Sequence, residues 1–181
     1  MLKQLSRKTG MNLLTNTGYY GFGQNKFVPE HAITATDREL AALWVREFEQ
    51  GIDSSGVRPG FIKISVENQD QLSEMHAKLV RAAGLTHLQT GLTIVSHTGP
   101  DGPAMAQLAL LSEMGVSPNA FVWTHAQNGT MDGFRKAAAL GAWISLDHIN
   151  AGTEDTSGNI EWYLETLVAL KSYGIQIGRA S

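Results

Sequence analysis

The stretch GFIKISVENQDQLSEMHAKLVRAAGLTHLQTGLTIVSHTG, residues 60–99, decides the fold of this chain. Its two ends are short runs rich in β-branched and aromatic residues, which are typical of buried strands. The segment between them has the length and composition of a helix. A helix that joins two strands in this way indicates that the strands are parallel. Apolar runs and helical patterns also alternate along the rest of the chain, so we expect a parallel sheet with crossover helices.

Five strands, each followed by a helix, account for most of the chain. The expected strands span residues 11–21, 60–67, 92–99, 120–127 and 142–149. The expected helices span residues 36–51, 68–91, 103–115, 130–141 and 160–174, and residues 1–10 have the pattern of the last turns of a further helix. Thr36 and Glu39 predict a capping box at the start of the helix over 36–51. No glycine-rich phosphate loop follows a strand, which favours a (β/α) TIM barrel over an open doubly wound sheet.

The composition excludes several classes of protein. The chain has 181 residues, 43% of them hydrophobic and 17% charged, with a formal net charge of −3 and no cysteine. Disulfides and thiolate metal sites are therefore excluded, and without a basic block we expect no nucleic-acid partner. No apolar run has the roughly 18 residues of a membrane span, so we expect no membrane partner. Residues 1–10 lack the apolar segment of a signal peptide. By default we expect a cytoplasmic location, and a leader peptide on a longer N-terminus stays an open alternative.

Polar residues stand at equivalent places in four of the expected strands. Lys63 lies toward the end of its strand, and His97, His125 and Asp147 each lie at or beside the end of theirs. Successive members of this set are separated by about one strand–helix unit. Polar side chains that converge at the carboxyl ends of parallel strands mark the active-site face of a (β/α) barrel. The sequence therefore predicts a functional site built from these four residues.

Alternation along each strand predicts which side chains share a face of the sheet. In the strand that ends at His125, Phe121, Trp123 and His125 are expected to face the barrel interior. Val122 and Thr124 are then expected on the helix side. The same rule places the polar residues of the other three strands on the interior face.

Each of these residues has more than one interpretation. His97 and His125 fall at matching positions of successive strands, where neutral imidazoles are common metal ligands, and we favour that role over ordinary loop histidines. Lys63 is predicted to extend to solvent, to form a Schiff base, or to be carbamylated by carbon dioxide into an anionic ligand that bridges two cations. Asp147, with the adjacent His148, is either a strand-terminal cap or a proton relay beside the metal.

Four motifs together resemble one known family. They are EQGIDSSGVRPGFIKI (49–64), TIVSHTG (93–99), FVWTHA (121–126) and WISLDHI (143–149). In this order and spacing they resemble the phosphotriesterase family of the amidohydrolase superfamily. The resemblance extends over nearly the whole chain, from residue 2 to about residue 175.

The resemblance implies a (β/α)₈ barrel with a binuclear metal centre, usually zinc. It implies that Lys63 becomes the bridging carbamate, formed with carbon dioxide, and that His97 and His125 each supply one metal ligand. The residues that resemble the proton relay of the family are Asp147 and His148. The residue that resembles the aromatic lining of the substrate pocket is Tyr20, just past a Thr-Gly pair.

The family's reaction is hydrolysis, in which a metal-bound hydroxide attacks a phosphoryl or carbonyl centre. The resemblance thus implies a small-molecule substrate that is a carboxylic ester, a lactone or a phosphotriester. Other divalent metals such as cobalt, manganese and iron would also suit these ligands. Two alternatives remain: a catalytically inactive barrel fragment or assembly partner, and an aldolase that uses Lys63 as a Schiff base.

The chain departs from the family in two places. The family's His-x-His pair on the first strand has no counterpart, since His31 is the only histidine before Lys63, and an aspartate expected on the eighth strand is also missing. A complete barrel needs about 250 residues. We therefore expect residues 1–181 to be a single partial barrel domain that lacks the first two strands and the last. Its exposed strand edges would favour pairing with another chain, a homo-oligomer included.

Overall fold

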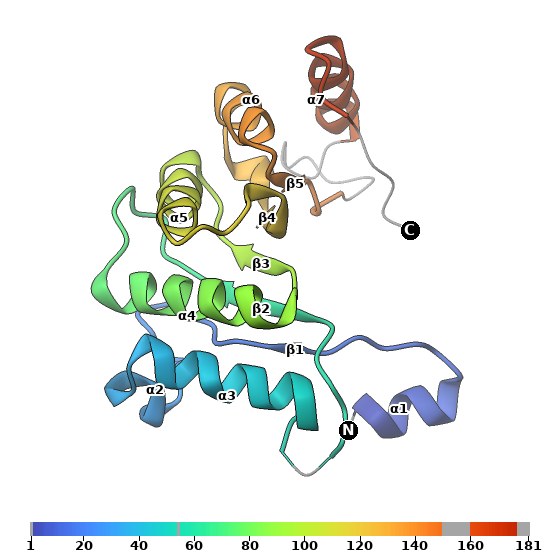
Figure 1. The fold of residues 1–181 in the computed structure, drawn as a ribbon. Coiled ribbons are helices and arrows are strands. Elements are labelled where there is room, and N and C mark those ends of the chain that lie inside the picture. The colour runs from blue at the N-terminus through green and yellow to red at the C-terminus, as the bar shows by residue number, and fades with distance from the viewer. Residues whose placement is uncertain (1, 54, 150–159, 177–181) are drawn as a thin grey trace.

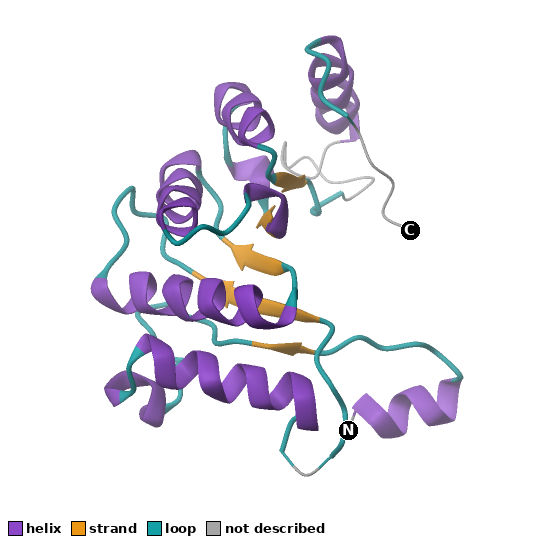
Figure 2. Ribbon diagram, viewed as in Figure 1, coloured by secondary structure: helices purple, strands orange, loops and turns teal. Residues whose placement is uncertain are grey.

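The computed structural model describes residues 2–53, 55–149 and 160–176. It contains one sheet of five strands, all parallel, whose order in space follows their order in the chain (Figures 1 and 2). The strands are β1 (Asn16–Thr17), β2 (Phe61–Ser65), β3 (Ile94–His97), β4 (Phe121–Thr124) and β5 (Trp143–Ser145). A parallel sheet in sequence order, with a helix after each strand, is the arrangement of consecutive units of a TIM barrel. The predicted fold class, an incomplete (β/α) barrel, is therefore confirmed.

Seven α-helices and two short 3₁₀ helices are described. The α-helices are α1 (Leu2–Thr9), α2 (Glu30–Thr34), α3 (Asp37–Gln50), α4 (Glu74–Thr90), α5 (Asp101–Glu113), α6 (Met131–Leu140) and α7 (Ile160–Ser172). The 3₁₀ helices are η1 (Pro118–Ala120) and η2 (Ala126–Asn128). The predicted capping box of Thr36 and Glu39 is present at the start of α3. None of these helices is both long and apolar enough to span a bilayer.

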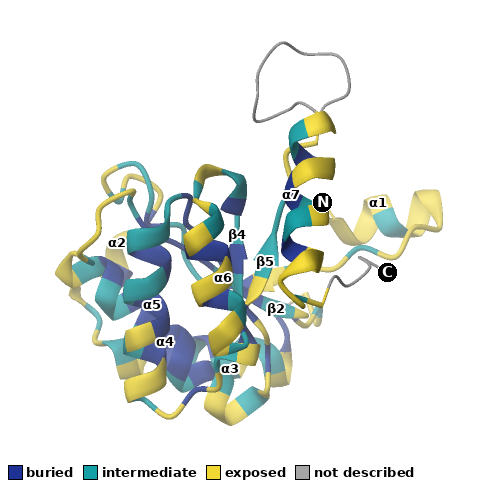
Figure 3. Cartoon of the chain, turned by 90° about the horizontal axis from the view of Figure 1, so that it is seen from above, coloured by how far each residue is buried: buried dark blue, intermediate teal, exposed yellow. Residues whose placement is uncertain are grey.

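Several elements differ from the sequence prediction. Helix α2 forms where the sequence indicated a loop, β1 has two residues where a run over 11–21 was expected, and α4 begins at Glu74 where a helix from residue 68 was expected. Helix α1 forms as predicted but contributes no buried residue, and Figure 3 shows it exposed along most of its length. The expected polar loop over 150–159 and the chain end at 177–181 lie outside the described residues.

One face of the sheet is covered by helices over β2, β3 and β4. Ile62, Ile64, Ile94, Phe121 and Trp123 all have 0% exposure. These side chains form one hydrophobic core with buried residues of the helices that cover them. Helices α4, α5 and α6 each contribute buried residues, which are dark blue in Figure 3.

The opposite face of the sheet is open. The strand register aligns Lys63, Val95, Val122 and Trp143 in one row across β2 to β5. The first three are only partly buried, and Trp143 is 56% exposed. In a complete barrel this face would point into the interior.

The face prediction for β4 is wrong. Phe121 and Trp123 face the helices, with the Trp123 ring centroid 5.6 Å from that of Phe134 in α6. Thr124 lies on the open face, where its hydroxyl oxygen is 3.4 Å from Lys63 Nζ. The prediction assumed that alternation continues to His125, but β4 ends at Thr124 and His125 has a left-handed backbone with φ 62°. This change in backbone direction brings His125 to the open side of the sheet. Continued alternation would have placed it on the helix-covered side, with Phe121 and Trp123.

Candidate active site at the carboxyl ends of the strands

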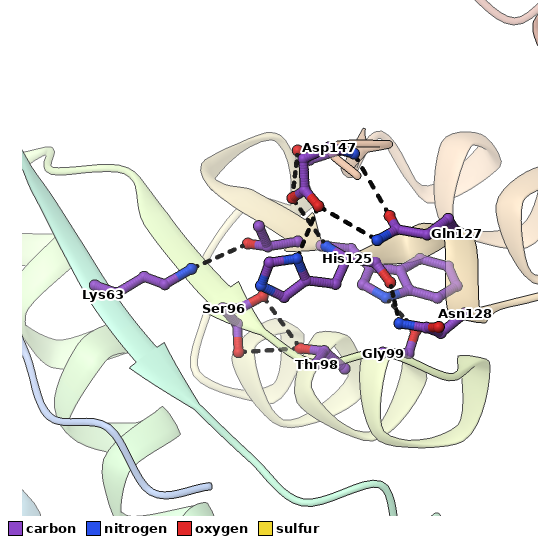
Figure 4. A network of polar contacts seen from close by, with 11 residues as sticks. Lys63, Ser96, Thr98, Gly99, His125, Gln127, Asn128 and Asp147 are labelled. Carbon is purple, nitrogen blue, oxygen red and sulfur yellow. Dashed lines mark hydrogen bonds and ion pairs between the residues drawn. The ribbon is translucent and has the colours of Figure 1, made fainter. Parts of the chain in front are cut away.

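Lys63 lies in the middle of β2 and points across the open face of the sheet. Its Nζ donates a hydrogen bond of 3.4 Å to Thr124 Oγ1 (Figure 4). The lysine side chain thus passes over β3 and reaches β4. Burial lowers the pKa of Lys63, and the Asp147 carboxylate partly opposes this effect. A lysine with a lowered pKa has a larger fraction of neutral, nucleophilic amine than a surface lysine. Of the three interpretations of Lys63, the simple extension to solvent fits this geometry least well.

His97 is the last residue of β3 and the centre of a group of rings. Its ring centroid lies 4.4 Å from that of His125 and 5.2 Å from that of Tyr20. Burial, followed by the nearby His125 and Lys63, lowers the pKa of His97 to about 4. The imidazole is therefore neutral at neutral pH, which is the form that binds metal ions.

His125 follows β4 and is held by Asp147. Asp147 Oδ1 accepts a hydrogen bond of 2.7 Å from His125 Nδ1, and Oδ2 accepts one of 3.2 Å from the His125 backbone N–H. Because a carboxylate only accepts, the proton of a neutral imidazole resides on Nδ1 and the lone pair on Nε2. A left-handed backbone at a residue other than glycine is strained, and such strain is concentrated at functional sites.

Asp147 connects β5 to this group. Its carboxylate also accepts hydrogen bonds of 3.2 Å from Ser145 Oγ and 3.4 Å from Gln127 Nε2 (Figure 4). Burial raises the pKa of Asp147, but the hydrogen bonds from the side chain and backbone of His125 outweigh it and leave the pKa below its usual value. Asp147 is therefore an ionised acceptor at neutral pH, as the orienting partner of a histidine requires.

The remaining two predicted residues differ in position. Tyr20 pairs with Ser65 in an isolated parallel bridge, and its ring lies beside His97, so the structure brings it to the site. His148 is exposed, and no hydrogen bond or ring contact joins it to Asp147 or His125 among the described residues. Within the described residues, no group of three or more His, Asp or Glu side chains is arranged to hold a metal ion.

The sequence reasoning missed a buried polar network behind His97. Ser96 Oγ donates a hydrogen bond of 2.6 Å to Gln107 Oε1, and Gln107 Nε2 donates one of 2.9 Å to Thr98 Oγ1. All three side chains have 0% exposure. Buried polar groups that satisfy one another make a rigid support, here for the end of β3 and hence for His97. The available signal was a polar residue at a helix-facing position of a buried strand, Ser96.

The fold and these side chains define a class of protein: a partial (β/α) barrel whose polar residues converge at the carboxyl ends of its strands. Comparison with known proteins gives the family. The model of the phosphotriesterase family matches residues 1–171, and the chain belongs to this family.

Two curated relatives and one solved structure illustrate the similarity. The chain is 36% identical over 144 residues to the phosphotriesterase homology protein of Escherichia coli, covering 79% of this chain and 48% of the relative. It is 26% identical over 148 residues to the aryldialkylphosphatase of Saccharolobus solfataricus, covering 81% and 46%. The chain thus spans about half the length of these relatives.

The solved structure is that of the phosphotriesterase homology protein from Escherichia coli, described as complexed with phosphate in its active site. It aligns with a TM-score of 0.82 and 32% identity over 96% of this chain and 58% of that one. The phosphate is a feature of that protein. The alignment agrees with the assignment of this sheet to part of a phosphotriesterase-like barrel.

Proposed function

We propose that this chain carries part of the active site of a metal-dependent hydrolase that acts on ester-type bonds. The observation that carries the proposal is the convergence of Lys63, His97 and His125 on the open face of the three inner strands, with the two imidazole rings 4.4 Å apart. Membership of the phosphotriesterase family supports it. Three basic nitrogen groups this close together repel one another if all are protonated and each lacks its own counter-anion. The arrangement is favourable when the groups are neutral, and neutral nitrogen groups can bind a metal cation.

The donor set fits a divalent metal ion. His97 is neutral because its pKa is about 4, and the lone pair of His125 is on Nε2 because Asp147 accepts from Nδ1. In the proposal, Lys63 supplies the third ligand as a carbamate. The ammonium first loses one proton to solvent, and the neutral amine then attacks the carbon of carbon dioxide. A nitrogen–carbon bond forms while one carbon–oxygen π bond becomes an oxygen lone pair, and a second N–H proton leaves to solvent. The lysine cation is thereby replaced by a carbamate anion. Zinc is the proposed metal, since nitrogen and oxygen ligands suit it.

The residues of this chain then have distinct tasks. When bound, a divalent metal ion polarises the oxygen of the scissile group and lowers the pKa of a coordinated water. His97, Lys63 and His125 would hold the ion, and Asp147 would orient the His125 ring and assist proton transfer. His148 would assist proton transfer in the proposal, which requires it to approach Asp147. Tyr20 would contact the substrate beside His97.

We propose the substrate class from the names of the relatives. The Saccharolobus relative is named an aryldialkylphosphatase, which supports a phosphotriester as one candidate substrate here. Carboxylic esters and lactones present a similar electrophilic centre with a polarisable oxygen, and we include both in the proposal.

The test is turnover by the purified chain after incubation with zinc chloride in bicarbonate buffer. The substrates are diethyl 4-nitrophenyl phosphate, 4-nitrophenyl acetate and an aliphatic lactone. We expect measurable turnover of at least one of these substrates. His125→Ala should reduce this turnover more than about 100-fold, because even residues that only orient a metal ligand change metal affinity or activity about 10–100-fold when they are replaced. Lys8→Ala, an exposed lysine on α1, is the control and should match the wild type.

Two results would favour another function. If no substrate turns over, the chain alone is an inactive fragment, and the unpaired edges of β1 and β5 among the described residues would support a role as an assembly partner or homo-oligomer subunit. If borohydride traps a carbonyl compound on Lys63, the residue forms a Schiff base, and the carbamate assignment is wrong.

A further inference from the structure

The segment Tyr20–Phe27, which we name the aromatic loop, crosses the carboxyl end of β2. It contains three aromatic residues, of which Tyr20 and Phe22 lie beside His97 and Phe27 lies beside Tyr20. The backbone passes so close to β2 that a Cβ built on Gly21 would lie 2.8 Å from the Ser65 carbonyl oxygen. The loop is therefore packed directly against the strand that carries Lys63.

Three side chains hold the backbone of this loop. Two come from β2 and the residues just after it, and one comes from α4. Ser65 Oγ accepts a hydrogen bond of 2.7 Å from the Phe22 N–H, and Glu67 Oε1 accepts one of 2.7 Å from the Gln24 N–H. His76, buried on α4, has its Nε2 3.1 Å from the Gly21 carbonyl oxygen. Three anchors over four consecutive residues fix the path of the loop.

The aromatic loop needs these anchors because its backbone is strained. Gln24 has φ 60° and Asn25 has φ 61°, so two consecutive residues other than glycine are in the left-handed region. The left-handed region is unfavourable for residues other than glycine, and such a conformation persists only where surrounding contacts determine it. The hydrogen bond from the Gln24 N–H to Glu67 acts at the first of the two strained residues.

The loop forms one wall beside the candidate metal ligands. The Phe22 ring centroid is 5.1 Å from that of His97, and the Phe27 ring is 5.8 Å from that of Tyr20. Phe27 is 58% exposed. Edge-to-face rings of this kind leave apolar surface available for a flat or apolar group.

We propose that Ser65 and Glu67 are positioning residues that hold the aromatic loop beside His97, and that Phe22 contacts the apolar group of a bound substrate. Residues 63, 65 and 67 are spaced at intervals of two along β2 and its extension. Side chains with this spacing point to the same face, which explains why Lys63, Ser65 and Glu67 all face the site and the loop. Lys63 serves the site itself, while the next two members of the series hold the wall beside it. The substrate contact rests on the proposed function, whereas the positioning role does not.

The positioning role is tested by amide hydrogen exchange in the full chain, measured by NMR in the absence of metal. Glu67→Ala should raise the exchange rate of the Gln24 amide about tenfold, the effect of losing one hydrogen bond, and should remove the NOE between the Phe22 and His97 rings. Glu67→Gln keeps an acceptor oxygen and should restore both signals. Glu49→Ala, at an exposed position of α3, is the matched control. Unchanged Gln24 exchange and an unchanged NOE in Glu67→Ala would overturn the positioning role.

The substrate contact is tested with two phosphonates that share a charged group and differ in the attached group. Phenylphosphonate and methylphosphonate are titrated into the zinc-loaded chain. Phe22→Ala should weaken phenylphosphonate about fivefold, the loss of one aromatic pair, and change methylphosphonate less than about twofold. Equal effects on both would overturn the contact. If neither phosphonate binds the wild type, the substrate contact fails together with the proposed function, while the exchange result still decides the positioning role.

Discussion

The two faces of this sheet differ in how deeply their side chains are buried. Along β2, Ile62 and Ile64 point to the helices and have 0% exposure, while Lys63 between them lies on the open face. Trp123 and Trp143 repeat the contrast with one residue type, since the first has 0% exposure and the second 56%. Neighbouring residues of one strand therefore serve different purposes.

The difference explains how a lysine can lie inside an apolar strand. The helix-covered face completes a core without any help from the open face, so residues of the open face need not be apolar. Lys63, His97 and Thr124 can then be selected for chemistry rather than for packing. The comparison predicts that substitutions on the covered face affect stability and substitutions on the open face affect ligand binding.

The largest effect is expected for a pair of tryptophan substitutions. Trp123→Ala should lower the free energy of unfolding by about 3–5 kcal/mol, because it empties a fully buried site and removes the hydrogen bond to the Gly99 carbonyl oxygen. Trp143→Ala should cost less than half of that. Urea denaturation followed by circular dichroism measures both. Equal losses would show that the open face is covered in solution, and the comparison would fail.

A smaller effect separates two adjacent residues that follow β5, Asp147 and His148. Asp147→Ala should weaken zinc binding about 10–100-fold, the usual consequence of removing the partner that orients a ligating histidine. His148→Ala should change it less than about twofold, because His148 has no contact with His125 among the described residues. Isothermal titration with zinc compares the two variants. Equal weakening in both would show that His148 supports zinc binding as strongly as Asp147 does, which its lack of contact with His125 does not allow.

The smallest effect concerns Glu39 of the capping box at the start of α3. Hydrogen bonds from the backbone and side chain of Thr36 lower the pKa of Glu39 from its usual 4.5. The ionised Glu39 therefore stabilises the folded state above pH 4.5, and this contribution is lost as the pH falls through the lowered pKa. The difference in unfolding free energy between wild type and Glu39→Gln should be constant near neutral pH and shrink in acid. A difference that grows in acid would have the wrong sign.

The sequence predicts much of the sheet because its signals are local. The run of β-branched residues around Lys63, the helix predicted over 68–91 and observed over 74–90, and the capping box of Thr36 and Glu39 each depend on neighbours in the chain. The parallel order of the strands follows from the helices between them. The positions of His97 and Lys63 on the open face also follow from alternation, and the register confirms both.

The part that sequence reasoning could not predict depends on backbone turns and on distant contacts. Alternation fails at His125 because a left-handed residue interrupts it, and no residue type in FVWTHA signals that turn. The roles of Ser65 and Glu67 could not be predicted either, because their partners Phe22 and Gln24 are 43 positions earlier in the chain. The metal ligands and the carbamate stay predictions.

The central claim is that Lys63, His97 and His125 together form a metal half-site on the open face. The most direct test is a native mass spectrum of the chain prepared with zinc in bicarbonate buffer, which reports subunit number, bound metal and lysine modification at once. We predict a species that carries zinc together with the mass of one carbon dioxide, and we predict that Lys63→Ala loses both. A chain that stays free of metal and unmodified under these conditions would contradict the account.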